Sequence, residues 1–156
     1  MTQSFRSSVW ALLVNKKKEF LLVQLNNAQP NEFDFVKWWM EDWETFEETL
    51  AREIKEELWE DFEFKILEKS NWRFVYDWPE EIQKERWFLW QVRTNYWVLA
   101  LNEKINIPKK ELKSYKLIKD TNMKDTLIWT WFPNEEYLKF EKEWKEIQDK
   151  YKSLFN

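Results

Sequence analysis

The sequence predicts one domain that mixes α-helices and β-strands over residues 1–156. This length is typical of a single domain and is enough to bury a core. Apolar runs of β-strand type alternate with polar turns along the chain. Two segments instead repeat apolar residues every three or four positions, as helices do. No repeat, linker or low-complexity tract divides the chain.

The first elements predict a β-hairpin. Residues 5–14 and 19–25 are apolar runs, and the polar NKKK segment between them indicates a turn. Residues 26–34 are expected to form a loop, and residues 35–37 a short strand that leads into a further loop.

A helix is predicted from Thr45 to Leu58. Thr45 and Glu48 have the spacing of a capping box, in which each side chain bonds the other residue's backbone N–H. The apolar residues of this segment recur at helical spacing, at Leu50, Ala51, Ile54 and Leu58.

The second half of the chain predicts further strands and a final helix. Strands are expected at residues 62–70, 72–78, 92–101, 115–118 and 127–132, with a bend near Ser70 and Asn71. Residues 79–91 are expected to form a loop. Pro133 and Asn134 begin the last helix, whose apolar stripe is Tyr137, Phe140, Trp144, Ile147, Tyr151 and Leu154.

Composition narrows the possible chemistry. The net charge of -4 argues against a broad nucleic-acid-coating surface, which is normally basic. The absence of Cys and His excludes disulfides, thiolate metal sites and imidazole bases, so catalysis would depend on carboxylates and a hard metal ion. We see no signal peptide, no long apolar run and no obligatory protein partner, and therefore expect a cytoplasmic protein without membrane association.

The helix from Thr45 carries the candidate catalytic groups. Glu53, Glu56 and Glu57 crowd one helical face, where like charges repel unless a cation lies among them. Oxygen ligands favour Mg²⁺ or Mn²⁺. A solvated acidic face is the alternative.

The surrounding residues resemble the Nudix box, the loop-helix-loop signature of the Nudix hydrolases. Five residues separate Trp38 from Glu44, and seven separate Glu44 from the run REIKEEL at 52–58. Glu44, Arg52, Glu53, Ile54, Glu56 and Glu57 match the family pattern. Trp38 and Trp59 stand where the family has Gly, and Glu60 stands where an aliphatic residue is usual.

The resemblance implies a Nudix fold of the α/β class, with a mixed β-sheet sandwiched between helices. It also implies a pyrophosphohydrolase in which Glu53, Glu56 and Glu57 hold metal and supply catalysis. The base is one of them or another carboxylate. Glu44, Arg52, Trp38, Trp39 and Trp59 would shape the loop, and Lys37 would meet a phosphate or be a surface residue.

A second likeness concerns the substrate. Tyr76-Asp77-Trp78-Pro79, followed by Trp90-Gln91 before an aromatic strand, is similar to the branch that includes RNA pyrophosphohydrolases and dinucleoside polyphosphate hydrolases. Tyr76, Lys84, Arg86 and Arg93 are its candidate substrate contacts, because Arg and Lys suit phosphates; otherwise they are core and surface residues. Other Nudix substrates, namely a nucleoside triphosphate or an ADP-sugar, and a non-catalytic nucleotide- or partner-binding module are the alternatives.

The tryptophans need an explanation. The chain has 13 Trp and no Gly, although Gly is about 7% of ordinary protein. Several stand at Gly positions of the box, which suggests UGA codons that mean glycine in the organism. The candidates are Trp10, Trp38, Trp39, Trp43, Trp59, Trp72, Trp90 and, less strongly, Trp87. Trp97 and Trp144 fit as genuine, and Trp78, Trp129 and Trp131 are undecided. If all are genuine, we expect poor folding and no activity.

Overall fold

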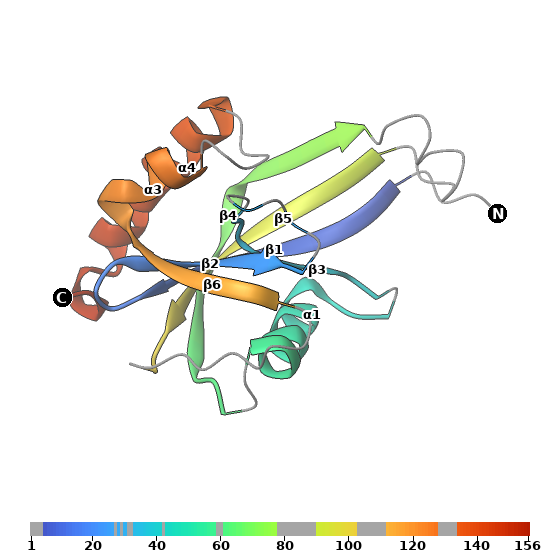
Figure 1. The fold of residues 1–156 in the computed structure, drawn as a ribbon, viewed down its shortest axis with the longest axis horizontal. Coiled ribbons are helices and arrows are strands. Elements are labelled where there is room, and N and C mark those ends of the chain that lie inside the picture. The colour runs from blue at the N-terminus through green and yellow to red at the C-terminus, as the bar shows by residue number, and fades with distance from the viewer. Residues whose placement is uncertain are drawn as a thin grey trace.

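The protein is a six-stranded mixed sheet with helices on both faces (Figure 1). The computed structural model describes residues 5–26, 28, 30, 33–41, 43–58, 61–77, 90–102, 112–127 and 134–156. Helix α1 (Phe46–Glu53) packs on one face and α4 (Asn134–Lys150) on the other. The predicted α/β/α architecture is therefore confirmed.

The predicted hairpin forms from β1 (Phe5–Asn15) and β2 (Glu19–Leu25). Lys18 in its turn has φ 63°, the one left-handed backbone among the described residues. The turn is closed by a hydrogen bond of 3.0 Å from Lys18 N to Asn15 O. The side chain of Asn15 adds a second closure, since it accepts from Glu19 N at 2.9 Å.

Strand β3 (Val36–Trp39) corrects one prediction. Trp38 and Trp39 were expected in a loop, but both are strand residues paired with β1, at Val9 and Ser8. Their side chains alternate across the sheet, and the Trp38 side chain is buried among apolar neighbours. Burial of its side chain therefore accounts for Trp38 lying in a strand and not in a loop.

The remaining strands are β4 (Phe64–Asp77), β5 (Trp90–Ala100) and β6 (Leu112–Lys119). The strand order is β4-β5-β1-β2-β6, with β3 beside β1, and β1 runs parallel to β5. The two strands predicted at 62–70 and 72–78 form one strand, whose register shifts between Lys69 and Arg73. A bend near Ser70 had been predicted there.

The helical elements of the second half include two that were not predicted. Asp120–Asn122 forms a 3₁₀ turn that runs into α3 (Met123–Leu127), so Leu127 ends a helix rather than beginning a strand. The rest of the predicted strand at 127–132 falls outside the described residues. Helix α4 follows, and Lys152–Leu154 is a closing 3₁₀ turn. None of the described helices is long and apolar enough to cross a membrane.

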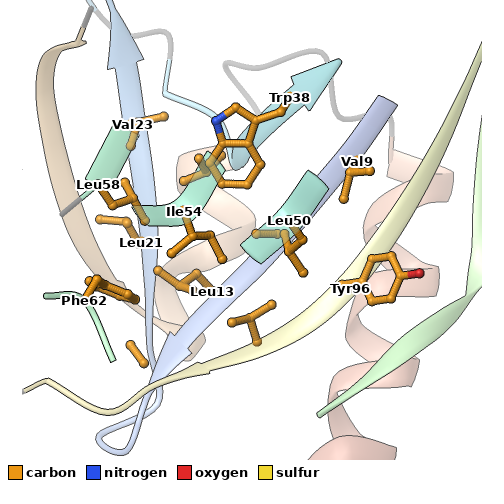
Figure 2. Close-up of a cluster of buried hydrophobic side chains, with 14 of the residues drawn as sticks. Val9, Leu13, Leu21, Val23, Trp38, Leu50, Ile54, Leu58, Phe62 and Tyr96 are labelled. Carbon is orange, nitrogen blue, oxygen red and sulfur yellow. The ribbon is translucent and has the colours of Figure 1, made fainter. Parts of the chain in front are cut away.

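The sheet separates two cores. The α1-side core is mainly aliphatic and contains Val9, Leu13, Leu21, Trp38, Leu50, Ile54, Leu58 and Tyr96 (Figure 2). The α4-side core is mainly aromatic and contains Trp10, Phe20, Phe35, Trp72, Trp97, Phe140 and Trp144. Phe140, Trp144 and Ile147 bury the apolar stripe predicted for the last helix.

Candidate active site

Helix α1, which carries the candidate site, begins after Thr45, its N-cap residue, where a capping box forms. Thr45 Oγ1 accepts a hydrogen bond from Glu48 N at 3.2 Å, and the Glu48 carboxylate accepts from Thr45 N at 3.4 Å. This is the predicted capping box, and it satisfies backbone donors that the first helical turn leaves without partners. The start of the acidic helix is therefore encoded locally.

The last turn of this helix differs from the prediction. The chain is α-helical to Glu53 and continues as a π-helical turn over Ile54–Leu58. Leu50, Ile54 and Leu58 recur every four residues, the spacing of one helical face, and all three are fully buried. Short π segments often occur at functional sites.

Burial of one helical face directs the charged residues outward. Leu50, Ile54 and Leu58 point into the core between α1 and the sheet, with Val9 on the side of Leu50 and Leu21 on the side of Leu58 (Figure 2). Arg52, Glu53 and Glu56 therefore stand on the part of the helix that is not packed in this core.

Arg52 gathers three carboxylates. Its Nε and Nη2 donate to the two oxygens of Glu44, each at 2.7 Å. Its Nη1 donates to Glu53 Oε1 at 2.7 Å and to Glu56 Oε2 at 3.2 Å. The two-pronged pair with Glu44 ties the loop before the helix to the helix itself, a geometry that Arg supplies and Lys cannot.

The charges in this network affect one another in opposite ways. The hydrogen bonds from Arg52 hold the pKa of Glu44 below its usual value. Burial raises the pKa of Glu53, although Arg52 acts against this shift and Glu56 adds to it. The hydrogen bonds to Glu44 and Glu53 raise the pKa of Arg52, which stays protonated.

The carboxylates fit a hard divalent cation. Glu53 and Glu56 both reach one nitrogen of a single positively charged group, so their oxygens can converge on one cation. The described residues hold no group of three acidic side chains arranged around a metal position. The side chain of Glu57 and the whole of Trp59 lie outside the described residues, as does Glu60.

Two of the candidate substrate residues meet on the other face of the sheet. Lys37 on β3 places Nζ 5.6 Å from the centre of the Trp10 ring, and the Arg93 guanidinium on β5 lies 3.2 Å from it. Tyr76 is paired with Gln91 on neighbouring strands, but its side chain is not described. Lys84 and Arg86 are outside the described residues.

The sequence did not single out two polar residues that the structure places near these groups. Tyr96 donates a hydrogen bond of 3.1 Å to Glu47, and so ties β5 to the first turn of α1. Asn95 is fully buried, and its Oδ1 has no hydrogen-bond partner among the described residues. Asn is uncommon inside strands, and that was the available signal.

The comparisons with known proteins agree with this geometry. The family model described as NUDIX domain matches residues 4–155. The chain belongs to the Nudix family. It is thus a hydrolase that acts on phosphoric anhydride bonds, in a family that generally uses divalent metal ions.

Solved structures share the fold at low sequence identity. The E. coli dihydroneopterin triphosphate pyrophosphohydrolase superposes with TM-score 0.61 and 14% identity, covering 83% of this chain and 90% of that one. A NUDIX hydrolase from Nitrosomonas europaea gives 0.62 and 10%, covering 90% and 89%. A UDP-X diphosphatase gives 0.54 and 14%, covering 76% of this chain but 53% of that one. No curated protein sequence matches significantly.

Proposed function

We propose that this Nudix protein is a metal-dependent pyrophosphohydrolase of nucleoside polyphosphates, with a dinucleoside polyphosphate or a 5'-triphosphorylated RNA end as substrate. The carrying observation is the convergence of Glu53 and Glu56 on one cationic group, on a helix whose loop is held by Glu44. The neighbouring Glu57 completes the carboxylate set in the sequence.

Each part of the site has a role in this proposal. Glu53, Glu56 and Glu57 would hold Mg²⁺ or Mn²⁺, and one of these or another carboxylate would take the proton of the attacking water. When bound, the cation would neutralise pyrophosphate charge and make a bound water more acidic. Glu44 and Arg52 hold the loop in position.

The substrate assignment depends on residues around the sheet. Lys37 and Arg93 supply two positive charges on one face, which suits a polyphosphate. Tyr76, Lys84 and Arg86 carry the sequence likeness to the branch that acts on RNA ends and dinucleoside polyphosphates. A nucleoside triphosphate or an ADP-sugar is the second candidate class, and a nucleotide- or partner-binding module without catalysis is the third.

We further propose that the eight tryptophan candidates are glycines in the natural protein, read from UGA codons. Indole hydrogen bonding supports part of this proposal. Trp97 and Trp144, which fit as genuine, donate to Glu143 and Asp120. Trp38 buries an indole N–H without a hydrogen-bond partner among the described residues, which is unfavourable, and Trp43 is 80% exposed.

Trp72 differs from Trp38, because its indole N–H donates to the Glu136 carboxylate. None of the described tryptophans has a left-handed backbone. The argument for glycine at these positions therefore concerns side-chain room and not φ. The nucleotide sequence of the gene and the peptide masses of the protein isolated from its organism test it directly, and UGG codons at these positions would refute it.

Activity tests the function. The chain as written and a variant with the eight candidates changed to Gly would be assayed with Mg²⁺ on diadenosine tetraphosphate and 5'-triphosphate RNA. We expect release of phosphate or pyrophosphate from the eight-glycine protein, and loss of activity in Glu56→Gln. Glu146→Gln, the same change at an exposed position of α4, is the matched control. A folded eight-glycine protein that cleaves neither substrate would redirect the assignment to the other candidates.

A further inference from the structure

The surroundings of the Trp10 side chain resemble those of a bound nucleobase. The ring is fully buried and lies against the Arg93 guanidinium, 3.2 Å from the ring centre. The Phe35 ring is 6.0 Å away, tilted by 46°. Proteins hold bases in the same way, stacked on arginine planes and against aromatic side chains. An indole is a planar bicycle like a purine, so it occupies a space of similar shape.

A buried amide lies beside this ring. Asn95 pairs with Trp10 in the parallel register of β1 and β5, so their side chains share the face that α4 covers. Asn95 Nδ2 donates to the Trp72 carbonyl at 3.2 Å, and its Oδ1 has no hydrogen-bond partner in the described part of the chain. A buried acceptor left unpaired is unfavourable. It would be satisfied by an N–H donor in the Trp10 space, such as the exocyclic amine of adenine.

The space is close to the surface and to positive charge. Lys37 is exposed, and its Nζ lies 5.6 Å from the centre of the Trp10 ring, so a positive charge at the surface lies beside the ring. Lys37 would meet phosphates attached to a base held there, while Arg93 lies over the ring itself. Along the chain, Lys37 on β3 stands seven residues before Glu44, which pairs with Arg52 on α1.

We propose that the space filled here by the Trp10 indole is the adenine-binding slot of the natural protein, in which residue 10 is glycine. Asn95 accepts from the exocyclic amine, and Arg93 stacks on the ring. This inference rests on the proposed function and on the glycine at position 10. The inference specifies adenine as the base that the enzyme recognises, and Asn95 and Arg93 as the residues that contact it. A cavity of about 150 Å³ left by a lost side chain is enough to bind a benzene-sized ring.

Nucleotide binding without metal tests the slot separately from catalysis. AMP binding would be measured by calorimetry in EDTA for the eight-glycine protein and for a variant that retains Trp10 but carries the other seven glycines. We expect binding only when residue 10 is glycine. A variant that retains Trp43 instead, which is 80% exposed, is the matched control and should bind AMP normally.

The role of Asn95 is tested with a ligand that lacks the amine. In the eight-glycine protein, Asn95→Ala should weaken AMP binding about tenfold, the usual effect of one lost buried hydrogen bond. It should leave the affinity for purine riboside 5'-monophosphate unchanged, because that ligand has no exocyclic amine. Equal losses for both ligands would overturn the assigned contact.

Folding and function have separate readouts. If the eight-glycine protein does not fold, the single variant Trp10→Gly would be heated with adenosine or purine riboside, and a rise in Tm with adenosine alone is expected. Absence of that rise there, or AMP binding that is the same with and without Trp10, overturns the slot. Hydrolysis that needs Glu56 but does not depend on residues 10 and 95 would support the proposed function and overturn the adenine slot. AMP binding that depends on Asn95, without hydrolysis, would support the adenine slot and overturn the proposed catalytic function.

Discussion

The two faces of the sheet are packed with different kinds of side chain. On the α1 side, mostly aliphatic residues fix a short helix whose outer side carries Arg52 and its carboxylates. On the α4 side, aromatic rings stack on one another, with Trp97 and Phe140 centres 5.5 Å apart and nearly parallel. The α1 side thus carries the carboxylate site, and the aromatic rings of the α4 side hold α4 against the sheet. We expect substitutions of the α1 carboxylates and of the α4 rings to separate activity from stability.

The largest expected effect is on activity. Glu53→Gln should lower turnover at least about 100-fold, since loss of a metal-binding oxygen exceeds the usual effect of changing a residue behind the ligands. Stability of the metal-free variant at neutral pH should not fall, because burial raises the pKa of Glu53 and its ionised form is unfavourable there. Steady-state assays measure turnover, and urea unfolding measures stability. A large loss of stability in Glu53→Gln would contradict the expectation that activity and stability separate.

The α4 side should show the largest effect on stability. Phe140→Ala removes a buried ring that contacts Phe20, Phe35 and Trp97, and should lower the free energy of unfolding by about 3–5 kcal/mol. Leu138→Ala on the same helix, 62% exposed, is the control and should change it by less than about 0.5 kcal/mol. Urea unfolding measures both free energies. Similar decreases in the two variants would show that α4 is not held by its aromatic side.

The loop before α1 should show a pH-dependent effect. Because Arg52 lowers the pKa of Glu44 in the folded state, the stabilisation from this pair is complete above the ordinary carboxyl pKa of 4.5. It is lost as pH falls through the lower, folded-state pKa. The difference in Tm between the unchanged protein and Glu44→Gln should therefore be present at pH 7 and disappear in acid. A difference that grows in acid would assign Glu44 another role.

The smallest expected effect concerns the contact between the sheet and the helix start. Tyr96→Phe removes one partly buried hydrogen bond to Glu47 and should cost about 1 kcal/mol. Turnover should fall less than in Glu53→Gln, because the capping box still fixes the helix start. Hydrogen exchange of the first turn of α1 would detect the loosening, and unchanged protection would mean that the capping box alone is sufficient.

Local patterns in the sequence determined several features. The capping box of Thr45 and Glu48, the hairpin turn and the stripe through Phe140 depend on residues close together in the chain, and all three form as predicted. The spacing of Glu44, Arg52, Glu53, Glu56 and Glu57 also indicated the family to which the chain belongs. These features are local because propensity and periodicity act over one or two helical turns.

Only the tertiary structure decided the rest. The parallel pairing of β1 with β5 joins segments about 85 positions apart in number, and no local signal encodes it. The π-helical turn at Ile54–Leu58 lies within a segment whose apolar spacing predicted a regular α-helix. Trp38 lies in a strand because its side chain is buried against α1, and Asn95 becomes a buried acceptor because β5 lies between β4 and β1. The sequence determined which charges are available, and packing determined which of them meet.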